Sequence, residues 1–315
     1  MSNVDILVTA PLPPFLYDPL KADYRTHDYS QAADKPAFLA SVGARVRGLV
    51  QGGGTVTPTT LLDGLPKLEI ISVFGVGYDG VPVPYCKERG IRVTNTPDVL
   101  TDDVADVAVA LVMMTGRGFV RLNRFVHAGE WKQRGPELTM KLSGKRVGIV
   151  GLGRIGKAIA HRLAAMGMSI AYTGRKPQDV PYAFVPDLRA LAAQSEFLVI
   201  ACPGGPATRN LIDADVLKAL GPKGVLVNIA RGSIVDEPAL VDALQKGIIG
   251  GAGLDVFADE PHIPEALFAM HNVVLLPHVG SATHETRRAM GDLCKANLDA
   301  WFNEHRTLTL IPELA

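Results

Sequence analysis

Near the middle of the chain stands Lys145-Arg-Val-Gly-Ile-Val-Gly-Leu-Gly-Arg-Ile-Gly156, a short apolar strand that runs into Gly151-x-Gly153-x-x-Gly156 and then into a helical pattern. In such a turn the first glycine permits a tight bend, the second lets backbone approach a pyrophosphate, and the third lets helix pack on strand. The helix N-terminus offers free N–H groups to the anion. The segment therefore predicts a dinucleotide-binding βαβ unit rather than a chance glycine turn.

The next expected strand, Ser169 to Tyr172, indicates which dinucleotide is bound. An NAD-binding unit usually places an Asp or Glu after this strand, on the ribose hydroxyls. This chain has Gly174, Arg175 and Lys176 instead. Two cations without a carboxylate suit a 2′-phosphate, because the planar guanidinium of Arg can donate two hydrogen bonds to phosphate oxygens and Lys adds a point charge. We therefore expect NADP(H) as the preferred cofactor, with NAD(H) possible; the alternative is an ordinary solvated basic turn.

The composition fits a globular enzyme of ordinary size. The chain has 315 residues with 47% hydrophobic content, so one or two domains can bury full cores. A formal net charge of +0 gives no excess of positive charge that would attract nucleic acid or an acidic membrane surface. The three cysteines, Cys86, Cys202 and Cys294, are widely spaced and odd in number. They favour reduced thiols over a disulfide framework or a metal site.

The N-terminus, Met1 to Thr9, reads as a first strand and lacks the basic start and long apolar run of a signal peptide. The longest apolar run, near Val107 to Met114, is too short to span a membrane. We therefore expect a cytoplasmic protein that has no nucleic-acid or membrane partner.

Strands and helices alternate along the chain, which is the pattern of parallel sheets covered on both faces. The alternation occurs twice, and a capped apolar helix from Thr101 to Met114 lies between the two sets. The first set comprises expected strands 6–10, 48–51, 70–74 and 92–94, with helices at 36–46 and 83–89. The second comprises expected strands 146–150, 169–172, 197–201, 225–229, 251–255 and 273–276.

A final helical pattern from Thr283 to Phe302 would carry the chain back to the first set. We therefore predict a dinucleotide-binding domain of residues 99–288, inserted into a discontinuous substrate-binding domain of residues 1–98 and 289–315. The active cleft would lie between these domains. Gly52-Gly53-Gly54 would be a strand-end loop that faces the cleft.

Three ionisable residues each stand just beyond a predicted strand of the second set, at the edge of a parallel sheet where ligands bind. Arg231 could bind a carboxylate through two hydrogen bonds, or it could simply be a solvated side chain at the sheet edge. Glu260 precedes Pro261 and could be an ordinary turn acid. His278 places an imidazole against small residues, although most histidines have no catalytic role. Each signal is modest when taken singly.

Five runs of the chain strengthen these signals together: Asn95-Thr-Pro-Asp-Val-Leu-Thr-Asp-Asp-Val-Ala-Asp106, Gly148-Ile-Val-Gly-Leu-Gly-Arg-Ile-Gly156, Asn228-Ile-Ala-Arg-Gly232, Gly251-Ala-Gly-Leu-Asp-Val-Phe257 and Leu276-Pro-His-Val-Gly280. In order and separation they resemble the D-specific 2-hydroxyacid dehydrogenase family, and within it the glyoxylate and hydroxypyruvate reductase branch, which includes plant hydroxyphenylpyruvate reductases. The resemblance implies an α/β fold of two Rossmann-like domains with parallel sheets, one flavodoxin-like and one dinucleotide-binding. It also implies a homodimer.

The resemblance implies that His278 is the acid/base, that Glu260 is its partner, and that Arg231 holds the substrate carboxylate and carbonyl. The chemistry of 2-keto acid reduction suits these roles, because negative charge builds on the carbonyl oxygen as hydride arrives and a proton donor must be charged near neutral pH. A carboxylate beside an imidazole favours the imidazolium. The implied reaction is NADPH-dependent reduction of a small 2-keto acid, such as glyoxylate or hydroxypyruvate, to the D-2-hydroxy acid.

The resemblance also implies contacts outside this trio. Phe74 to Asp79 resembles the family's carboxylate loop, in which the amides of Val76 and Gly77 bind the substrate acid; the alternative is an ordinary strand-to-helix turn. Val126 to Gln133 resembles the dimer-forming loop, from which Trp131 either reaches the partner's active site or packs on its own domain. Further cofactor contacts are implied at Leu152, Arg154, Ile155, Thr173, Cys202, Thr208, Ile229, Ala230, Asp255, Val104 and Gly280.

Rival functions share the same motifs. Phosphoglycerate dehydrogenase prefers NAD, which Arg175 and Lys176 argue against. The formate dehydrogenase branch uses Gln where Glu260 stands. A dinucleotide-sensing transcriptional corepressor of this fold would bind cofactor and show little turnover. The substrate side chain is left open, so glyoxylate, hydroxypyruvate, a hydroxyphenylpyruvate and a sugar-derived keto acid all fit the sequence.

Overall fold

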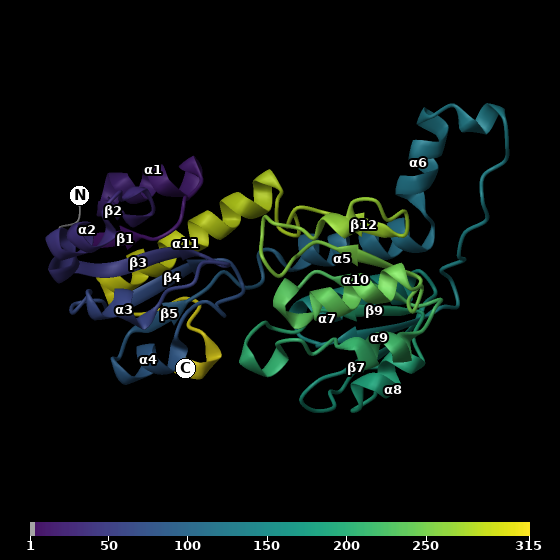
Figure 1. Ribbon diagram of the computed structural model, residues 1–315. Coiled ribbons are helices and arrows are strands. Elements are labelled where there is room, and N and C mark those ends of the chain that lie inside the picture. The colour runs from purple at the N-terminus through teal and green to yellow at the C-terminus, as the bar shows by residue number, and fades with distance from the viewer. Residues whose placement is uncertain (1–3) are drawn as a thin grey trace. The chain divides into compact units, whose positions relative to one another are not determined.

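The computed structural model describes residues 4–315, so residues 1–3 of the expected first strand lie outside the described residues. The chain divides into two compact units (Figure 1). Unit 1 comprises the chain up to Leu100 together with Thr283–Ala315, and unit 2 is Thr101–Ala282. The divisions fall at the starts of helices α5 (Thr101–Gly116) and α11 (His284–Glu304), so neither helix is split between units. Our predicted boundaries, at 98/99 and 288/289, differ from these by a few residues.

Unit 1 is built on a five-stranded parallel sheet of order β2-β1-β3-β4-β5, the flavodoxin-like order with its reversal between β1 and β3. Edge strand β2 reads Arg-Thr-His-Asp and was not among the strands we predicted, because it has no apolar residue. The central strands are buried and apolar, as expected for a sheet covered on both faces. The strands are β1 (Asp5–Val8), β2 (Arg25–Asp28), β3 (Val46–Gly52), β4 (Ile70–Phe74) and β5 (Arg92–Thr94).

The helices of unit 1 cover this sheet, and α11 packs against β4 and α1. Our helix prediction for 36–46 was wrong at its end, because the α-helix stops at Val42 and strand β3 already begins at Val46. A Cβ at Gly43 would lie 2.2 Å from the carbonyl oxygen of Gly64, so the neighbouring loop fixes the chain there. The remaining α-helices are α1 (Pro14–Asp23), α2 (Lys35–Val42), α3 (Thr59–Asp63) and α4 (Val83–Glu88).

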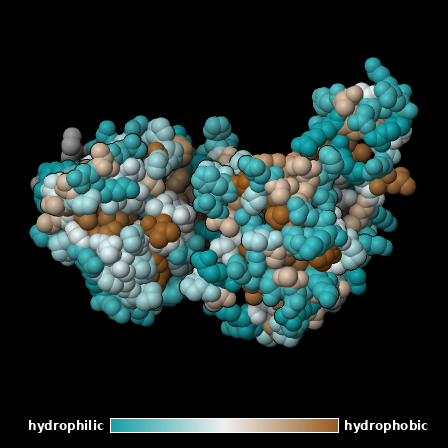
Figure 2. Space-filling model, viewed as in Figure 1, coloured by the Kyte–Doolittle hydropathy of each residue, from teal (hydrophilic) through white to brown (hydrophobic). Residues whose placement is uncertain are grey.

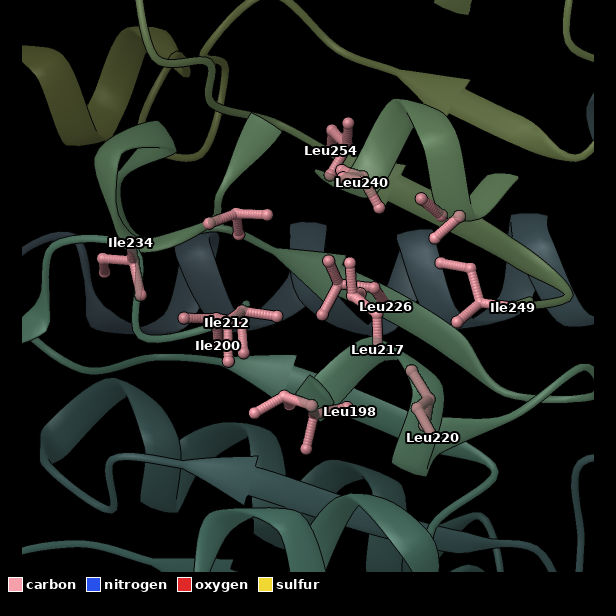
Figure 3. Packing of buried hydrophobic residues seen from close by; sticks show 14 of the residues in the cluster. Leu198, Ile200, Ile212, Leu217, Leu220, Leu226, Ile234, Leu240, Ile249 and Leu254 are labelled. Carbon is pink, nitrogen blue, oxygen red and sulfur yellow. The ribbon is translucent and has the colours of Figure 1, made fainter. Parts of the chain in front are cut away.

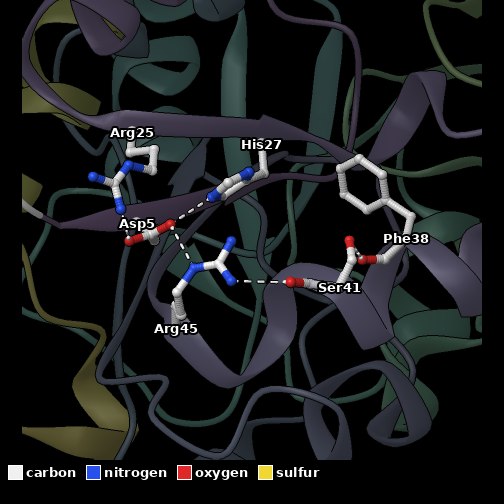
Figure 4. A network of polar contacts seen from close by, with 6 residues as sticks. All are labelled: Asp5, Arg25, His27, Phe38, Ser41 and Arg45. Carbon is white, nitrogen blue, oxygen red and sulfur yellow. Dashed lines mark hydrogen bonds and ion pairs between the residues drawn. The ribbon is translucent and has the colours of Figure 1, made fainter.

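A polar cluster joins the amino ends of the first strands of unit 1 (Figure 4). The buried carboxylate of Asp5 lies 2.6 Å from Nε2 of His27, 3.4 Å from Nη1 of Arg25 and 3.5 Å from Nε of Arg45. Arg45 also donates to the carbonyl of Ser41. A buried carboxylate is tolerated when basic groups surround it in this way. The cluster therefore reads as structural support for the sheet edge.

Unit 2 is built on a seven-stranded parallel sheet of order β12-β11-β10-β9-β6-β7-β8. Counted from β6 this is the dinucleotide-binding order 3-2-1-4-5-6 with one further strand, and the order reverses between β6 and β9. All six strands that we predicted are present, and short β8 is additional. The strands are β6 (Arg146–Val150), β7 (Ser169–Thr173), β8 (Ala183–Phe184), β9 (Phe197–Ile200), β10 (Val225–Asn228), β11 (Gly251–Leu254) and β12 (Val273–Leu275).

A core of aliphatic side chains joins this sheet to its helices (Figure 3). Leu198, Leu226 and Leu254 of the strands pack with Leu217 of α9 and Leu240 of α10, all close to fully buried. Fully burying a Leu contributes about 1.5–3 kcal/mol, so this cluster holds the strand ends in place. The remaining α-helices are α6 (Phe119–His127), α7 (Arg154–Ala165), α8 (Leu188–Ala193), α9 (Ala214–Leu220) and α10 (Glu237–Gln245).

Residues 117–142, which we call the arm, leave the body of unit 2 with α6 and return to β6 (Figure 1). Trp131 and Leu138 of the arm are 65% and 99% exposed. Figure 2 shows a mostly hydrophilic surface on this face, with hydrophobic residues in small scattered groups. No helix within residues 4–315 is long and apolar enough to cross a lipid bilayer.

Candidate active site

The glycine turn between β6 and α7 lies at the reversal of the unit 2 sheet. Gly151 has a φ of +94°, and a Cβ there would lie 2.6 Å from Cα of Cys202, which follows the neighbouring strand β9. A Cβ at Gly156 would lie 2.2 Å from the carbonyl oxygen of Gly151. Folding therefore requires both glycines. Gly153 differs, because a Cβ there would meet no described atom within 4 Å. The absence of a side chain at Gly153 suits the close approach of a ligand.

Helix α7 begins at Arg154, three residues earlier than the helical pattern of 157–166 that we predicted. No side chain caps it at Gly153, whereas Asp187, Asp213 and Asp236 cap the three following helices. The first N–H groups of a helix lack intrahelical partners and carry partial positive charge. An uncapped N-terminus after an exposed glycine is thus suited to receive a phosphate anion.

The basic residues after β7 are exposed, and within residues 4–315 no carboxylate pairs with Arg175 or Lys176. Gln178 ties their loop to the glycine turn. Its side-chain amide donates to the carbonyl of Leu152 at 2.9 Å, and its backbone N–H donates to the hydroxyl of Tyr172 at 2.6 Å. The structure therefore places two unpaired cations beside the glycine turn. Nothing in the sequence pattern singled out Gln178, because its role depends on this tertiary contact.

His278 and Glu260 form a direct pair, with Nδ1 of the imidazole 2.7 Å from Oε2 of the carboxylate. The other carboxylate oxygen accepts the backbone N–H of Phe257 at 3.0 Å. Burial raises the pKa of Glu260, but these hydrogen bonds and the charges of His278 and Arg231 outweigh it and bring the pKa below its ordinary value. Glu260 is therefore ionised at neutral pH, and the side chains of both residues remain accessible to solvent.

Asp255 holds the loop that carries His278. It is 1% exposed, and its two carboxylate oxygens accept the backbone N–H groups of Val279 and Gly280, each at 2.8 Å. Its carbonyl accepts the N–H of His278, whose φ is +54°. Burial is the main reason that the pKa of Asp255 is raised, against the lowering effect of these hydrogen bonds. Val104 of α5 packs beside Gly280. Asp255 thus fixes the unusual backbone on which His278 stands.

Arg231 follows β10 in a turn closed by Asn228. The amide of Asn228 donates to the carbonyl of Arg231 at 2.9 Å, and its oxygen accepts the N–H of Ala230 at 3.1 Å. A Cβ at Gly232 would lie 1.8 Å from the carbonyl carbon of Phe257, so this turn abuts the loop that leads to Glu260. Folding therefore brings Arg231 into the electrostatic neighbourhood of Glu260. We did not single out Asn228, although an Asn at a strand end is a common turn former.

Val76 and Gly77 lie in unit 1, in the loop after β4. A Cβ at Gly75 would lie 2.9 Å from Cα of Gly53, so the glycine loops after β3 and β4 pack directly on one another. Among residues 4–315 no protein acceptor takes the backbone N–H of Val76 or Gly77. The loop therefore offers two adjacent donors, as an anion-binding backbone turn requires.

The other implied contacts are less distinctive. Thr208 donates to the carbonyl of Pro203 at 2.8 Å and so braces the loop after β9. Burial raises the pKa of the Cys202 thiol to about 11, so this cysteine is a protonated packing residue at neutral pH. Ile229 is buried. Within the described part of the chain, no cluster of His, Cys, Asp and Glu is arranged to hold a metal ion.

Comparison with known proteins gives close and nearly full-length matches. Residues 109–280 match the sequence profile described as "D-isomer specific 2-hydroxyacid dehydrogenase, NAD binding domain". The hydroxyphenylpyruvate reductase of Plectranthus scutellarioides is 47% identical over 310 residues, which are 98% of this chain and 99% of that protein. Glyoxylate/hydroxypyruvate reductase A of Arabidopsis thaliana is 47% identical over 311 residues, with 98% and 99% covered. The crystal structure of an NADPH-dependent glyoxylate/hydroxypyruvate reductase from Sinorhizobium meliloti, in complex with NADP and malonate, matches with a TM-score of 0.91 at 44% identity, covering 99% of this chain and 98% of that one.

Proposed function

The chain belongs to the D-isomer specific 2-hydroxyacid dehydrogenase family, and we propose that it reduces a small 2-keto acid, such as glyoxylate or hydroxypyruvate, to the D-2-hydroxy acid with NADPH. The observation that carries the proposal is the 2.7 Å pair of His278 and Glu260 next to Arg231, in the same unit as the glycine turn. The named relatives reduce acids of this kind, and one was solved with NADP and a small dicarboxylate.

The cofactor site has two parts. The turn from Gly151 to Gly156 and the uncapped start of α7 would hold the pyrophosphate, and Arg175 with Lys176 would hold the 2′-phosphate. Asp255, Val104 and Gly280 would border the nicotinamide end. The reduced nicotinamide supplies the hydride when it is bound. The exposed, unpaired cations and the open space at Gly153 fit such a ligand.

The charged trio divides the remaining chemistry. Glu260 is ionised and accepts a hydrogen bond from Nδ1–H of His278, which leaves Nε2–H of the ring to deliver a proton to the carbonyl oxygen of the substrate. Arg231 orients the substrate through its carboxylate and carbonyl and offsets the charge that develops on the oxygen. The amides of Val76 and Gly77 add neutral donors for the carboxylate. Arg231 and His278 together favour the alkoxide-like transition state over the ketone.

A homodimer is part of the proposal, and the arm supports it. Phe119, Val126, Trp131 and Leu138 expose apolar side chains there. A cavity of about 740 Å³ opens between the arm and the amino ends of β10 to β12. Exposed apolar surface beside a large cavity marks an interaction site. Trp131 would then contact the partner and contribute to substrate selectivity.

The double variant Val126→Glu, Leu138→Glu tests the dimer. Charges at exposed apolar arm positions should yield a monomer by analytical ultracentrifugation, with the fold retained. A wild-type protein that is already monomeric would contradict the dimer. A monomeric variant with unchanged preference among keto acids would contradict the selectivity role of Trp131.

The cytoplasmic location is proposed on the free cysteines alone and is checked by cell fractionation.

The function itself is tested by turnover. Purified protein is supplied with NADPH or NADH and with glyoxylate, hydroxypyruvate, hydroxyphenylpyruvate or 2-ketogluconate. We expect faster oxidation of NADPH, a D-configured product, and one clearly preferred acid. Faster NADH oxidation would favour a phosphoglycerate dehydrogenase-like enzyme. Tight cofactor binding without turnover of any acid would favour a dinucleotide sensor.

A further inference from the structure

We propose that Asn95 is a positioning residue for the substrate carboxylate, and that the C-terminal segment Leu308–Thr309 holds it in place. The inference deepens the proposed function and rests on it, because it takes the amides of Val76 and Gly77 as carboxylate donors. All the residues concerned belong to unit 1.

Segment 95–96 fixes both peptide planes that carry the two amides. The backbone N–H of Thr96 donates to the carbonyl of Gly75 at 2.9 Å, and the side-chain amide of Asn95 donates to the carbonyl of Val76 at 2.9 Å. Both peptides are trans, so each carbonyl points opposite to the N–H of the following residue. Holding the carbonyls of Gly75 and Val76 therefore aims the N–H groups of Val76 and Gly77. The hydrogen bond to Gly75 comes from backbone and could be made by any residue except proline at position 96, whereas the hydrogen bond to Val76 requires the side chain of Asn95.

The chain's C-terminal return anchors Asn95 in turn. The hydroxyl of Thr309 donates to the carbonyl of Asn95 at 2.6 Å, and the N–H of Asn95 donates to the carbonyl of Thr309 at 3.3 Å. Next to these bonds, Thr94 and Leu310 form an antiparallel bridge. Residues more than 200 positions apart in the sequence thus lock together beside the carboxylate loop.

A fully buried amide on α11 completes the network. The oxygen of Asn297 accepts the N–H groups of Leu308 and Thr309 at 3.1 and 3.0 Å, and its nitrogen donates to the Thr309 hydroxyl at 2.8 Å. A second bond from that nitrogen reaches the carbonyl of Leu293. Every hydrogen-bonding position of this buried amide is used, and such networks define one geometry because breaking any bond leaves a desolvated polar group.

The network therefore does more than stabilise a loop, since its outer end sets the direction of two ligand-binding donors. Losing the Asn95 amide frees the Val76–Gly77 peptide to rotate. Affinity for the substrate carboxylate should fall, while the glycine turn and the charged trio of unit 2 lose no hydrogen bond. This predicts a change in KM for the keto acid that is much larger than the change in kcat or in NADPH affinity.

The test compares Asn95→Ala with Ser72→Ala. Ser72 makes a buried hydrogen bond from β4 to the carbonyl of Cys294 on α11, in the same unit, without touching the carboxylate loop. For Asn95→Ala we expect KM for glyoxylate and the calorimetric Kd for malonate to rise about tenfold, with kcat and KM for NADPH within about threefold of wild type. Ser72→Ala should lower the Tm but leave KM within about twofold.

Thr309→Val and Thr309→Ser keep the inference testable if Asn95→Ala does not fold. The valine removes the hydroxyl that links Asn297 to Asn95, and it should raise KM and the malonate Kd in the same direction. The serine keeps the hydroxyl and should restore both values. Suppose that the wild type reduces keto acids and that the folded Asn95 and Thr309 variants keep its KM and malonate Kd. This result would overturn the inference while the proposed function stands. Absence of turnover by the wild type would overturn the function, and malonate calorimetry would then still decide whether Asn95 aims the donors.

Discussion

The two units present donors to anions in different ways. In unit 2 the glycine turn leads into α7, and the helix supplies aligned N–H groups through its own secondary structure. In unit 1 the loop after β4 opens no helix at Val76 and Gly77, and its donors depend on tethers from Asn95 and, behind it, the C-terminal segment. A local motif therefore suffices for the proposed phosphate site, whereas a network of distant residues builds the proposed carboxylate site.

The units also differ in charge. The groups assigned to chemistry in unit 2 are Arg231, Glu260 and His278, all ionisable, whereas those in unit 1 are neutral backbone amides. Charged groups can respond to the charge that develops during reaction, and neutral donors bind substrate and transition state more nearly alike. Variants in unit 2 should accordingly act on turnover, and variants in unit 1 on KM.

The largest expected effect tests the charged side of this contrast. Arg231→Lys keeps the positive charge but loses the planar fork, so we expect kcat/KM to fall about 10³-fold at saturating NADPH. Arg189→Lys, in an exposed ion pair with Asp215 in the same unit, should leave kcat/KM within about twofold. Steady-state kinetics on both variants provide the check. Near-normal turnover by Arg231→Lys would remove Arg231 from the chemistry.

The second effect distinguishes the glycines of the proposed phosphate site. Gly153→Ala puts a methyl group into open space, so we expect a Tm within about 2 °C of wild type and an NADPH Kd raised about 10²-fold. Gly151→Ala meets the backbone of Cys202 and a positive φ, and it should lower the Tm strongly. Fluorescence titration with NADPH and thermal melts measure both. Unchanged NADPH affinity in Gly153→Ala would contradict the placement of the pyrophosphate.

A moderate effect concerns cofactor choice. Replacing Arg175 and Lys176 together with Ala should reduce the preference for NADPH over NADH about 10- to 100-fold, and the rate with NADH should change little. Lys246→Ala, which removes an exposed ion pair with Asp242 of α10, is the control for loss of surface charge. The ratio of kcat/KM for the two cofactors is the quantity to compare. If the double variant keeps the wild-type ratio of kcat/KM for the two cofactors, Arg175 and Lys176 are solvated surface residues that do not bind the 2′-phosphate.

The smallest effect concerns stability and pH. Because the pKa of Glu260 is below its ordinary 4.5 in the folded protein, its ionised form stabilises the fold at neutral pH, and this stabilisation disappears as the pH falls through the folded value. Glu260→Gln should therefore cost about 0.2–1 kcal/mol in unfolding free energy near pH 7, and the difference from wild type should shrink below pH 4.5. Urea denaturation across this range gives the comparison. If the difference in unfolding free energy between wild type and Glu260→Gln grows toward acid pH, the lowered pKa of Glu260 is contradicted.

Local patterns predicted what local physics determines. Apolar runs such as Ile70–Phe74 and Arg146–Val150 were predicted with the observed bounds, because strands buried on both faces must be apolar. Polar β2 and two-residue β8 carry no such signal and were not predicted. The order of motifs also indicated that Glu260 and His278 follow strand ends, although their 2.7 Å contact is visible only in the structure.

Tertiary hydrogen bonds explain what the sequence did not reveal. Gln178, Asn228 and Asn297 are ordinary polar residues in the sequence, and each acquires its role from a backbone group that folding brings near. Asn95 lay within a recognised motif without an assigned role, because the carbonyl that it holds lies 19 positions earlier. Positioning residues of this kind leave no periodic or compositional pattern.

The most direct test of the account is whether turnover requires a carboxylate on the substrate. NADPH oxidation by the purified protein is measured with hydroxypyruvate and with hydroxyacetone, which carries a methyl group in place of the carboxylate. We predict rapid reduction of hydroxypyruvate and a kcat/KM for hydroxyacetone at least about 10³-fold lower, because Arg231, Val76 and Gly77 would have no anion to hold. Comparable rates with both compounds, or none with either, would contradict the account.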